Sequence, residues 1–144
     1  MQAYKEFFIT NLETLSKEIS AFENESDLWK LEGSINNTCG NLVMHLCGNL
    51  KHYLGFGIGK NGYIRNRDSE FSIKDLSKDK LLNEINSTIE AITPVLEKIT
   101  GEDLHKKYDY DFFGEGATIE YVFMRTASHF TYHLGQINYF RRLL

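Results

Sequence analysis

The chain has 144 residues, of which 42% are apolar and 25% charged, and it carries a net charge of −4. This length suits a single domain that buries roughly two-thirds of its unfolded surface, and the composition argues against disorder. No basic cluster is present to neutralise phosphates, and no apolar run reaches the length of a membrane span. We therefore expect one domain over residues 1–144, with neither nucleic acid nor a membrane as a partner.

Four stretches repeat apolar residues every three or four positions, which predicts amphipathic helices. The third repeat is the clearest and extends from Leu82 to Ile99, with Ser77 placed as its N-cap. Pro94 lies late in this repeat, where it predicts a kink. The expected helices lie near residues 2–22, 35–56, 77–99 and 117–142.

The connections over residues 57–76 and 100–117 are long for a helical bundle. A connection of this length permits a crossover that leaves the second and third helices parallel. Aromatic residues alternate with acids between residues 105 and 116, which is typical of a short extended segment. The predicted fold class is an all-α four-helix bundle with long crossover connections.

Two histidines in the last predicted helix, His129 and His133, are spaced to bind one metal ion. Residues four apart lie on one face of a helix, so both imidazoles can reach the same point. A stable site needs a third ligand from another helix: His45 is the natural candidate, and His52, seven residues later, is its rival. Three neutral histidines with an open position are typical of a catalytic metal site, although the same spacing also occurs between unrelated histidines.

Two amides lie close to these histidines in the sequence. Asn49 follows His45 by one helical turn, and Gln136 follows His133 by three residues. Either amide can orient an imidazole or hydrogen-bond a metal-bound water. The alternative for both is a buried amide that ties helices together.

A dense group of charges follows the glycine-rich stretch after the second helix. Arg65 and Arg67 can clamp a carboxylate or a phosphate at the mouth of the bundle. The favoured interpretation is that Asp68 and Glu70 pair with these arginines and fix the loop.

The two cysteines, Cys39 and Cys47, form no C-x-x-C motif and are too few for a disulfide framework. Because no signal peptide is apparent, we expect a reducing cytoplasm. Cys47 lies two residues from His45, so a helix directs it away from the ligand face and into the core. No nucleophile motif or carboxylate pair is present, and no catalytic residue is assigned.

Two segments resemble the DinB/YfiT-like family of bacterial metal-binding bundles. One is Asn41–Leu50, which contains His45, and the other is Ser128–Ile137, which matches the pattern H-x-x-x-H-x-G-Q-I. The Arg65–Phe71 segment resembles an uncharacterised branch of that family. The resemblance implies a bundle in up-down-down-up order and a homodimer. It also implies that His45, His129 and His133 bind one divalent metal ion, with zinc or nickel favoured.

Relatives in this family include S-transferases and isomerases that use the small thiols mycothiol, bacillithiol or glutathione. The resemblance therefore implies a metal-dependent enzyme of the thiol S-transferase type that acts on a small-molecule substrate. Two alternatives are a metal-dependent hydrolase with the same ligands and a non-enzymatic binding or stress protein that retains the fold. An open coordination position beside a second polar patch would favour an enzyme over a binding protein.

Overall fold

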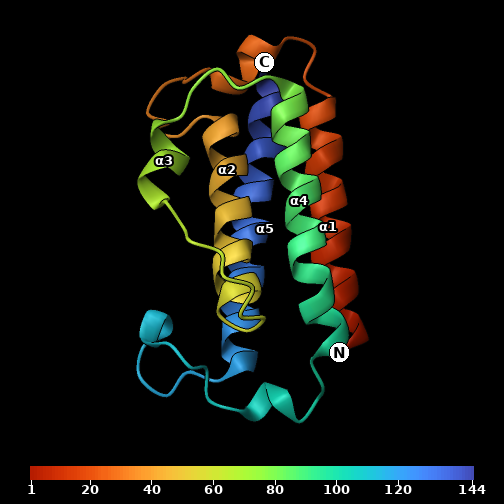
Figure 1. Cartoon of the computed structure of the whole chain (residues 1–144). Helices are drawn as coiled ribbons and strands as arrows, with labels where there is room; N and C mark the ends of the chain where they lie inside the picture. The colour runs from red at the N-terminus through yellow and green to blue at the C-terminus, as the bar shows by residue number, and fades with distance from the viewer.

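A computed structural model describes all residues from 1 to 144. The chain has four long helices, which follow one another in up-down-down-up order (Figure 1). Apart from one isolated bridge between Lys107 and Thr118, no β structure is present. The predicted all-α fold class is thus confirmed. The long helices are α1 (Gln2–Ser20), α2 (Cys39–Leu50), α4 (Lys78–Lys98) and α5 (Ile119–Leu143).

The apolar stripes of the four helices form one core. Helix α1 packs against α4 and α5, and α2 packs against the same two helices from the other side. In α1 the stripe is fully buried and consists of Phe8, Leu12, Leu15 and Ile19. Burying each of these side chains contributes about 1.5–3 kcal/mol, so the helix is held chiefly by its packing. None of the helices combines the length and apolarity needed to span a bilayer.

Helix α2 begins at Cys39, four residues later than the predicted start at residue 35, because Thr38 caps it. The Thr38 hydroxyl accepts a hydrogen bond from the Asn41 N–H at 3.1 Å, which satisfies one free donor of the first turn. After Leu50 the helix continues as a π-helix, η2 (Lys51–Phe56). Wider turns of this kind are rare and often lie at functional sites.

The π-helix ties the second long connection to the bundle. The carbonyl of Tyr53 accepts a hydrogen bond from the Tyr108 hydroxyl at 3.0 Å. Gly57 allows this contact, because a Cβ there would collide with the Tyr108 oxygen. The connection carries two short 3-10 helices, η3 (Asp103–His105) and η4 (Asp111–Phe113), and closes the end of the bundle opposite the C-terminus (Figure 1).

The crossover between α2 and α4 carries a short helix that the apolar pattern did not predict, α3 (Arg67–Ser72). Figure 1 shows it on the outside of the bundle beside α2. The Asn41 side-chain amide donates to the carbonyls of Glu70 and Ile73, at 3.0 and 2.8 Å. These two bonds fix α3 against the helix that carries His45. Helix α4 then begins after its predicted N-cap, Ser77, and continues through Pro94 to Lys98.

Candidate metal centre

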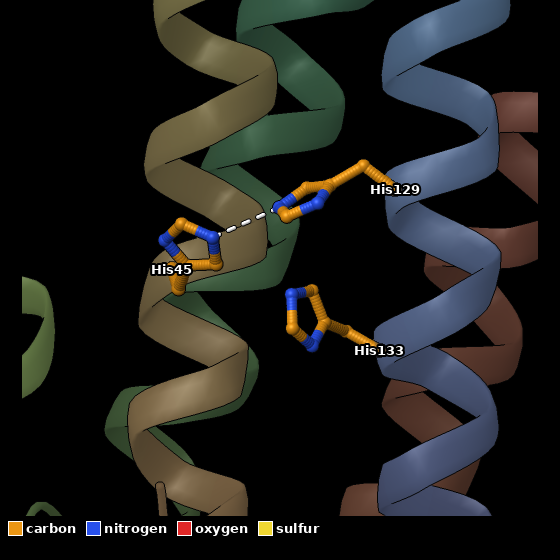
Figure 2. Close-up of side chains that lie close together, drawn as sticks. All are labelled: His45, His129 and His133. Carbon is orange, nitrogen blue, oxygen red and sulfur yellow. Dashed lines mark hydrogen bonds between the residues drawn. The ribbon is translucent and has the colours of Figure 1, made fainter.

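Three histidines meet between α2 and α5 (Figure 2). His45 projects from α2, while His129 and His133 project from successive turns of α5. One potential ligand atom from each ring lies within 4.8 Å of the others. The Nε2 atoms of His45 and His129 are 2.8 Å apart. The structure therefore brings together the three histidines that were singled out in the sequence.

The two imidazoles of α5 are neutral at pH 7. Burial, together with the neighbouring His133 and His45, lowers the pKa of His129 to about 4. Burial likewise lowers the pKa of His133, and the hydrogen bond to Gln136 only partly opposes this. Burial disfavours the charged form of any group, and a neutral imidazole keeps the lone pair that a metal requires. Both side chains are thus in the state suited to a ligand.

A buried carboxylate orients His45. The Nδ1 of His45 lies 2.8 Å from Oε2 of Glu70, so Nδ1 donates its proton there and the unprotonated Nε2 points its lone pair at Nε2 of His129. Such a carboxylate behind a ligating histidine fixes the tautomer and raises the basicity of the ring. Arg65 in turn donates two hydrogen bonds to Glu70, from Nε to Oε1 at 2.6 Å and from Nη2 to Oε2 at 2.8 Å.

Glu70 is ionised in this arrangement. Burial alone would raise its pKa, but the hydrogen bonds from His45 and Arg65 and the charge of Arg65 lower it below the usual range. The bidentate pair with Arg65 is the geometry in which a carboxylate is held most firmly. The predicted pairing of Glu70 with an arginine is therefore present, while its second role as the partner of His45 was not foreseen.

Gly48 makes room for this carboxylate. It lies three residues after His45 on α2, and a Cβ at this position would collide with Oε1 of Glu70. A glycine inside a helix costs about 0.5–1 kcal/mol relative to alanine, so its presence calls for a local reason. A glycine one helical turn from His45 was therefore the feature of the sequence that could have indicated a close contact between α2 and another side chain.

The two amides expected near the histidines behave differently. Oε1 of Gln136 accepts a hydrogen bond from Nδ1 of His133 at 2.7 Å, which leaves Nε2 of that ring free. Asn49 is buried and lines a cavity with His45 and His129, but the hydrogen-bond partner of His45 is Glu70.

The remaining two histidines lie apart from the cluster. His52, the rival third ligand, packs among aromatic rings, with its ring centroid 4.6 Å from that of Phe112 and 5.7 Å from that of Phe56. His52 belongs to the π-helix. The prediction that it shares a face with His45 assumed regular α-helical turns, and the wider π-helical turn breaks that spacing. The side chain of His105 is 80% exposed, as expected for a solvated residue.

The donor set fits a divalent ion. Two of the three rings have their second nitrogen hydrogen-bonded to an oxygen, which is the usual support of ligating histidines. In a tetrahedral site with bonds of about 2.0–2.1 Å, two ligand nitrogens are about 3.3 Å apart. The 2.8 Å between His45 and His129 would therefore open by only about half an ångström.

Two cavities reach the histidines from different ends of α5. One cavity, at the N-terminal side, has a volume of about 270 Å³ and contacts His45 and His129. Because three arginines line it, we call it the arginine cavity. The other cavity, at the C-terminal side, has a volume of about 490 Å³ and contacts His133. Its lining is mainly apolar, and we call it the apolar cavity. The arginines are Arg65, Arg67 and Arg125; the apolar wall includes Ile35, Leu42, Tyr132, Tyr139, Phe140 and Leu143.

The fold is that of a DinB-like helical bundle. The structure matches the crystal structure of a DinB-like protein from Bacillus cereus ATCC 10987 with a TM-score of 0.78 and 17% identity, covering 99% of this chain and 91% of that one. It also matches a conserved protein from Enterococcus faecalis with a TM-score of 0.76 and 13% identity, covering 99% and 95%. The sequence resemblance to the DinB-like proteins is confirmed at the level of the fold.

The family assignment follows from the sequence. The family described as protein of unknown function (DUF1572) matches residues 1–144, and the chain belongs to it. A comparison with curated proteins gives no significant match.

Proposed function

We propose that this protein is a divalent-metal-dependent enzyme of the thiol S-transferase type, with His45, His129 and His133 as the metal ligands. The observation that carries the proposal is the convergence of three imidazoles at a point that two cavities reach. Structural zinc sites are closed by four protein ligands, whereas catalytic sites keep a position open for water or substrate. Three ligands beside open cavities match the second arrangement.

The protein's own side chains hold and orient the site. Glu70 keeps Nδ1 of His45 protonated and Nε2 free, and Gln136 does the same for His133. A divalent ion bound by neutral ligands retains its full charge and lowers the pKa of a thiol or a water in the open position. The apolar cavity at His133 offers a water-poor environment for an organic electrophile.

The chain itself provides no thiolate for this chemistry. Cys39 and Cys47 are both buried, and burial raises the pKa of each to about 12. At pH 7 such thiols are almost entirely protonated and are poor nucleophiles. The thiol would therefore be a small molecule that enters from solvent, as in the S-transferases of the resemblance.

A homodimer is part of the proposal. Tyr132, Tyr139 and Leu143 are exposed on one end of α5, at 65%, 69% and 65%. Large apolar side chains that gather on a surface are typical of interfaces. A second copy of the chain would cover them.

The test begins with metal binding by the full chain, purified without an affinity tag. We expect one zinc or nickel ion per chain, and we expect His133→Ala to lower the affinity by more than about 100-fold in a chelator competition, since two ligands do not make a stable site. His105→Ala changes an exposed histidine and is the matched control. Equal affinity of the His133→Ala variant and the wild type would overturn the metal assignment.

The metal-loaded protein is then incubated with an aryl halide and each of three thiols: glutathione, bacillithiol and mycothiol. We expect a thioether product whose formation requires both metal and thiol. Metal-dependent cleavage of esters without any thiol would identify the hydrolase alternative. A bound metal with neither reaction would favour the non-enzymatic alternative.

A further inference from the structure

We propose that Arg67 and Arg125 form a binding subsite for the carboxylate or phosphate group of a small ligand, beside His45 and His129. Both side chains line the arginine cavity with these two histidines. The inference deepens the proposed function and rests on it for the role of the ligand as a substrate, because it names an anionic substrate class for the same site. The binding itself depends only on the arginines.

The cavity concentrates positive charge in a chain that is negative overall. The chain has a net charge of −4 and only five arginines, and three of these line this one cavity. No acidic side chain lines it. A cavity lined by charges of one sign raises the local concentration of ligands of the opposite sign.

Arg65 differs from the other two arginines because it is already neutralised. Its Nε and Nη2 atoms both bind Glu70, and its side chain is 9% exposed. It serves to hold Glu70 against His45. The anion clamp suggested by the sequence, Arg65 with Arg67, is therefore revised to Arg67 with Arg125.

Arg67 and Arg125 have no acidic partner within the chain. Neither takes part in any of the nine ion pairs. The guanidinium carbon of Arg67 lies 5.4 Å from the centre of the Phe71 ring, which supports the side chain by a cation–π contact. Guanidinium groups bind carboxylates and phosphates through paired N–H donors, so both arginines keep their donors available for a ligand.

Each arginine stands one helical turn from a group of the metal centre. Arg125 precedes His129 by four residues on α5, and Arg67 precedes Glu70 by three residues on α3. Residues at these spacings share a helix face. An anion between the two guanidinium groups would thus lie next to the histidines. The volume of about 270 Å³ limits the ligand, or the part of it that enters, to a small group.

The test uses the full-length, metal-free protein, titrated by calorimetry with inorganic phosphate and separately with succinate. We expect saturable binding of at least one of the two, weakened about 10-fold by Arg67→Gln or Arg125→Gln and lost in the double variant. Arg142→Gln removes an exposed arginine of α5 that lines neither cavity, and it should leave binding unchanged. Binding of phosphate alone identifies a phosphorylated ligand, and binding of succinate alone a carboxylate.

No saturable binding of either anion by the wild type would overturn the inference. An equal loss in the Arg142→Gln variant would also overturn it, because binding would then reflect net charge. Circular dichroism and the thermal midpoint of each variant report whether it is folded. Arg67→Lys is a second variant that retains the charge and the alkyl chain but lacks the paired donors, and it should bind more weakly than the wild type.

Zinc binding is measured on the same variants, so that the two proposals can fail separately. The arginine variants keep all three histidines and should bind zinc with wild-type affinity in the absence of anion. Loaded zinc should tighten anion binding several-fold, and by linkage the anion should tighten zinc binding equally. Anion binding without zinc binding would refute only the proposed function, and zinc binding without anion binding would refute only the subsite.

Discussion

The two cavities at the histidine cluster differ in chemistry because different segments line them. The arginine cavity takes its charges from the crossover before α3, from the start of α3 and from the first half of α5, and its aromatic rings from the π-helix and the connection before α5. The apolar cavity is formed by residues 34–37, Cys39, Leu42 and the last turns of α5. The bundle supplies one set of imidazoles, while the segments around it give one approach basic side chains and the other mainly apolar ones. Proteins that share a fold can differ in function because different side chains surround the site.

The two cavities also differ in how firmly their walls are held. On the arginine side, Glu70 is joined to His45, Arg65 and, through its carbonyl, Asn41. On the apolar side, Tyr132 and Tyr139 are more than half exposed. A fixed polar wall suits a ligand that must be oriented, whereas an apolar wall imposes no direction on what it contacts.

The largest expected effect concerns the cysteine of the apolar cavity. Burial raises the pKa of Cys39 from the usual value of 9.0 to about 12, so at pH 8 its thiolate fraction falls about 1,000-fold. We expect an aromatic disulfide reagent to label native Cys39 at least about 1,000-fold more slowly than the unfolded chain, as followed by mass spectrometry. Cys47, in the core, is the internal reference. Rapid labelling of native Cys39 would mean that the apolar cavity holds its own nucleophile.

A smaller effect is expected from Glu70→Gln on the arginine side. Loss of the carboxylate behind His45 should lower zinc affinity about 10- to 100-fold. The change also leaves the Arg65 guanidinium buried without its counter-ion, which costs about 3–5 kcal/mol in the free energy of unfolding. Asp68→Asn, on the exposed face of the same short helix, is the control. Unchanged zinc affinity would show that Glu70 does not organise this side of the site.

The destabilisation by Glu70→Gln should depend on pH. The pKa of Glu70 is lowered from the usual 4.5 in the folded protein, so the ion pair stabilises the fold above that pH and is lost as the pH falls through the folded pKa. Urea unfolding of wild type and variant should therefore differ at pH 7 and converge under acidic conditions.

The smallest effect should come from adding one methyl group next to Glu70. Gly48→Ala places a Cβ against the Glu70 carboxylate and should cost about 1–3 kcal/mol through overpacking, with a loss of zinc affinity of roughly 10-fold or less. Gly135→Ala is the matched control in α5, because a Cβ there meets nothing within 4 Å. It should be neutral or stabilise the helix by up to about 1 kcal/mol. Equal behaviour of the two variants in urea unfolding would contradict the packing argument.

The fold was predictable because it depends on spacing. The apolar repeats set the long helices, and the four-residue interval between His129 and His133 placed both rings on one face. The role of Glu70 was not predictable in this way, since α3 is a short capped turn without a repeat and Glu70 meets His45 only through the path of the crossover. Arg125 was missed because an exposed arginine on a helix is ordinarily solvated, and only the cavity distinguishes it.

The order of the helices has a consequence for when the three-histidine cluster can form during synthesis. His45 and His129 are 84 residues apart in the chain, and closing a flexible loop of that length costs about 4 kcal/mol of chain entropy. A domain generally folds as a unit, and the histidines of α5 leave the ribosome only after α1, α2 and α4. Because the core also needs α5, an ion bound by all three histidines would be captured only once the last helix has been made, and until then the nascent chain carries one histidine of the three.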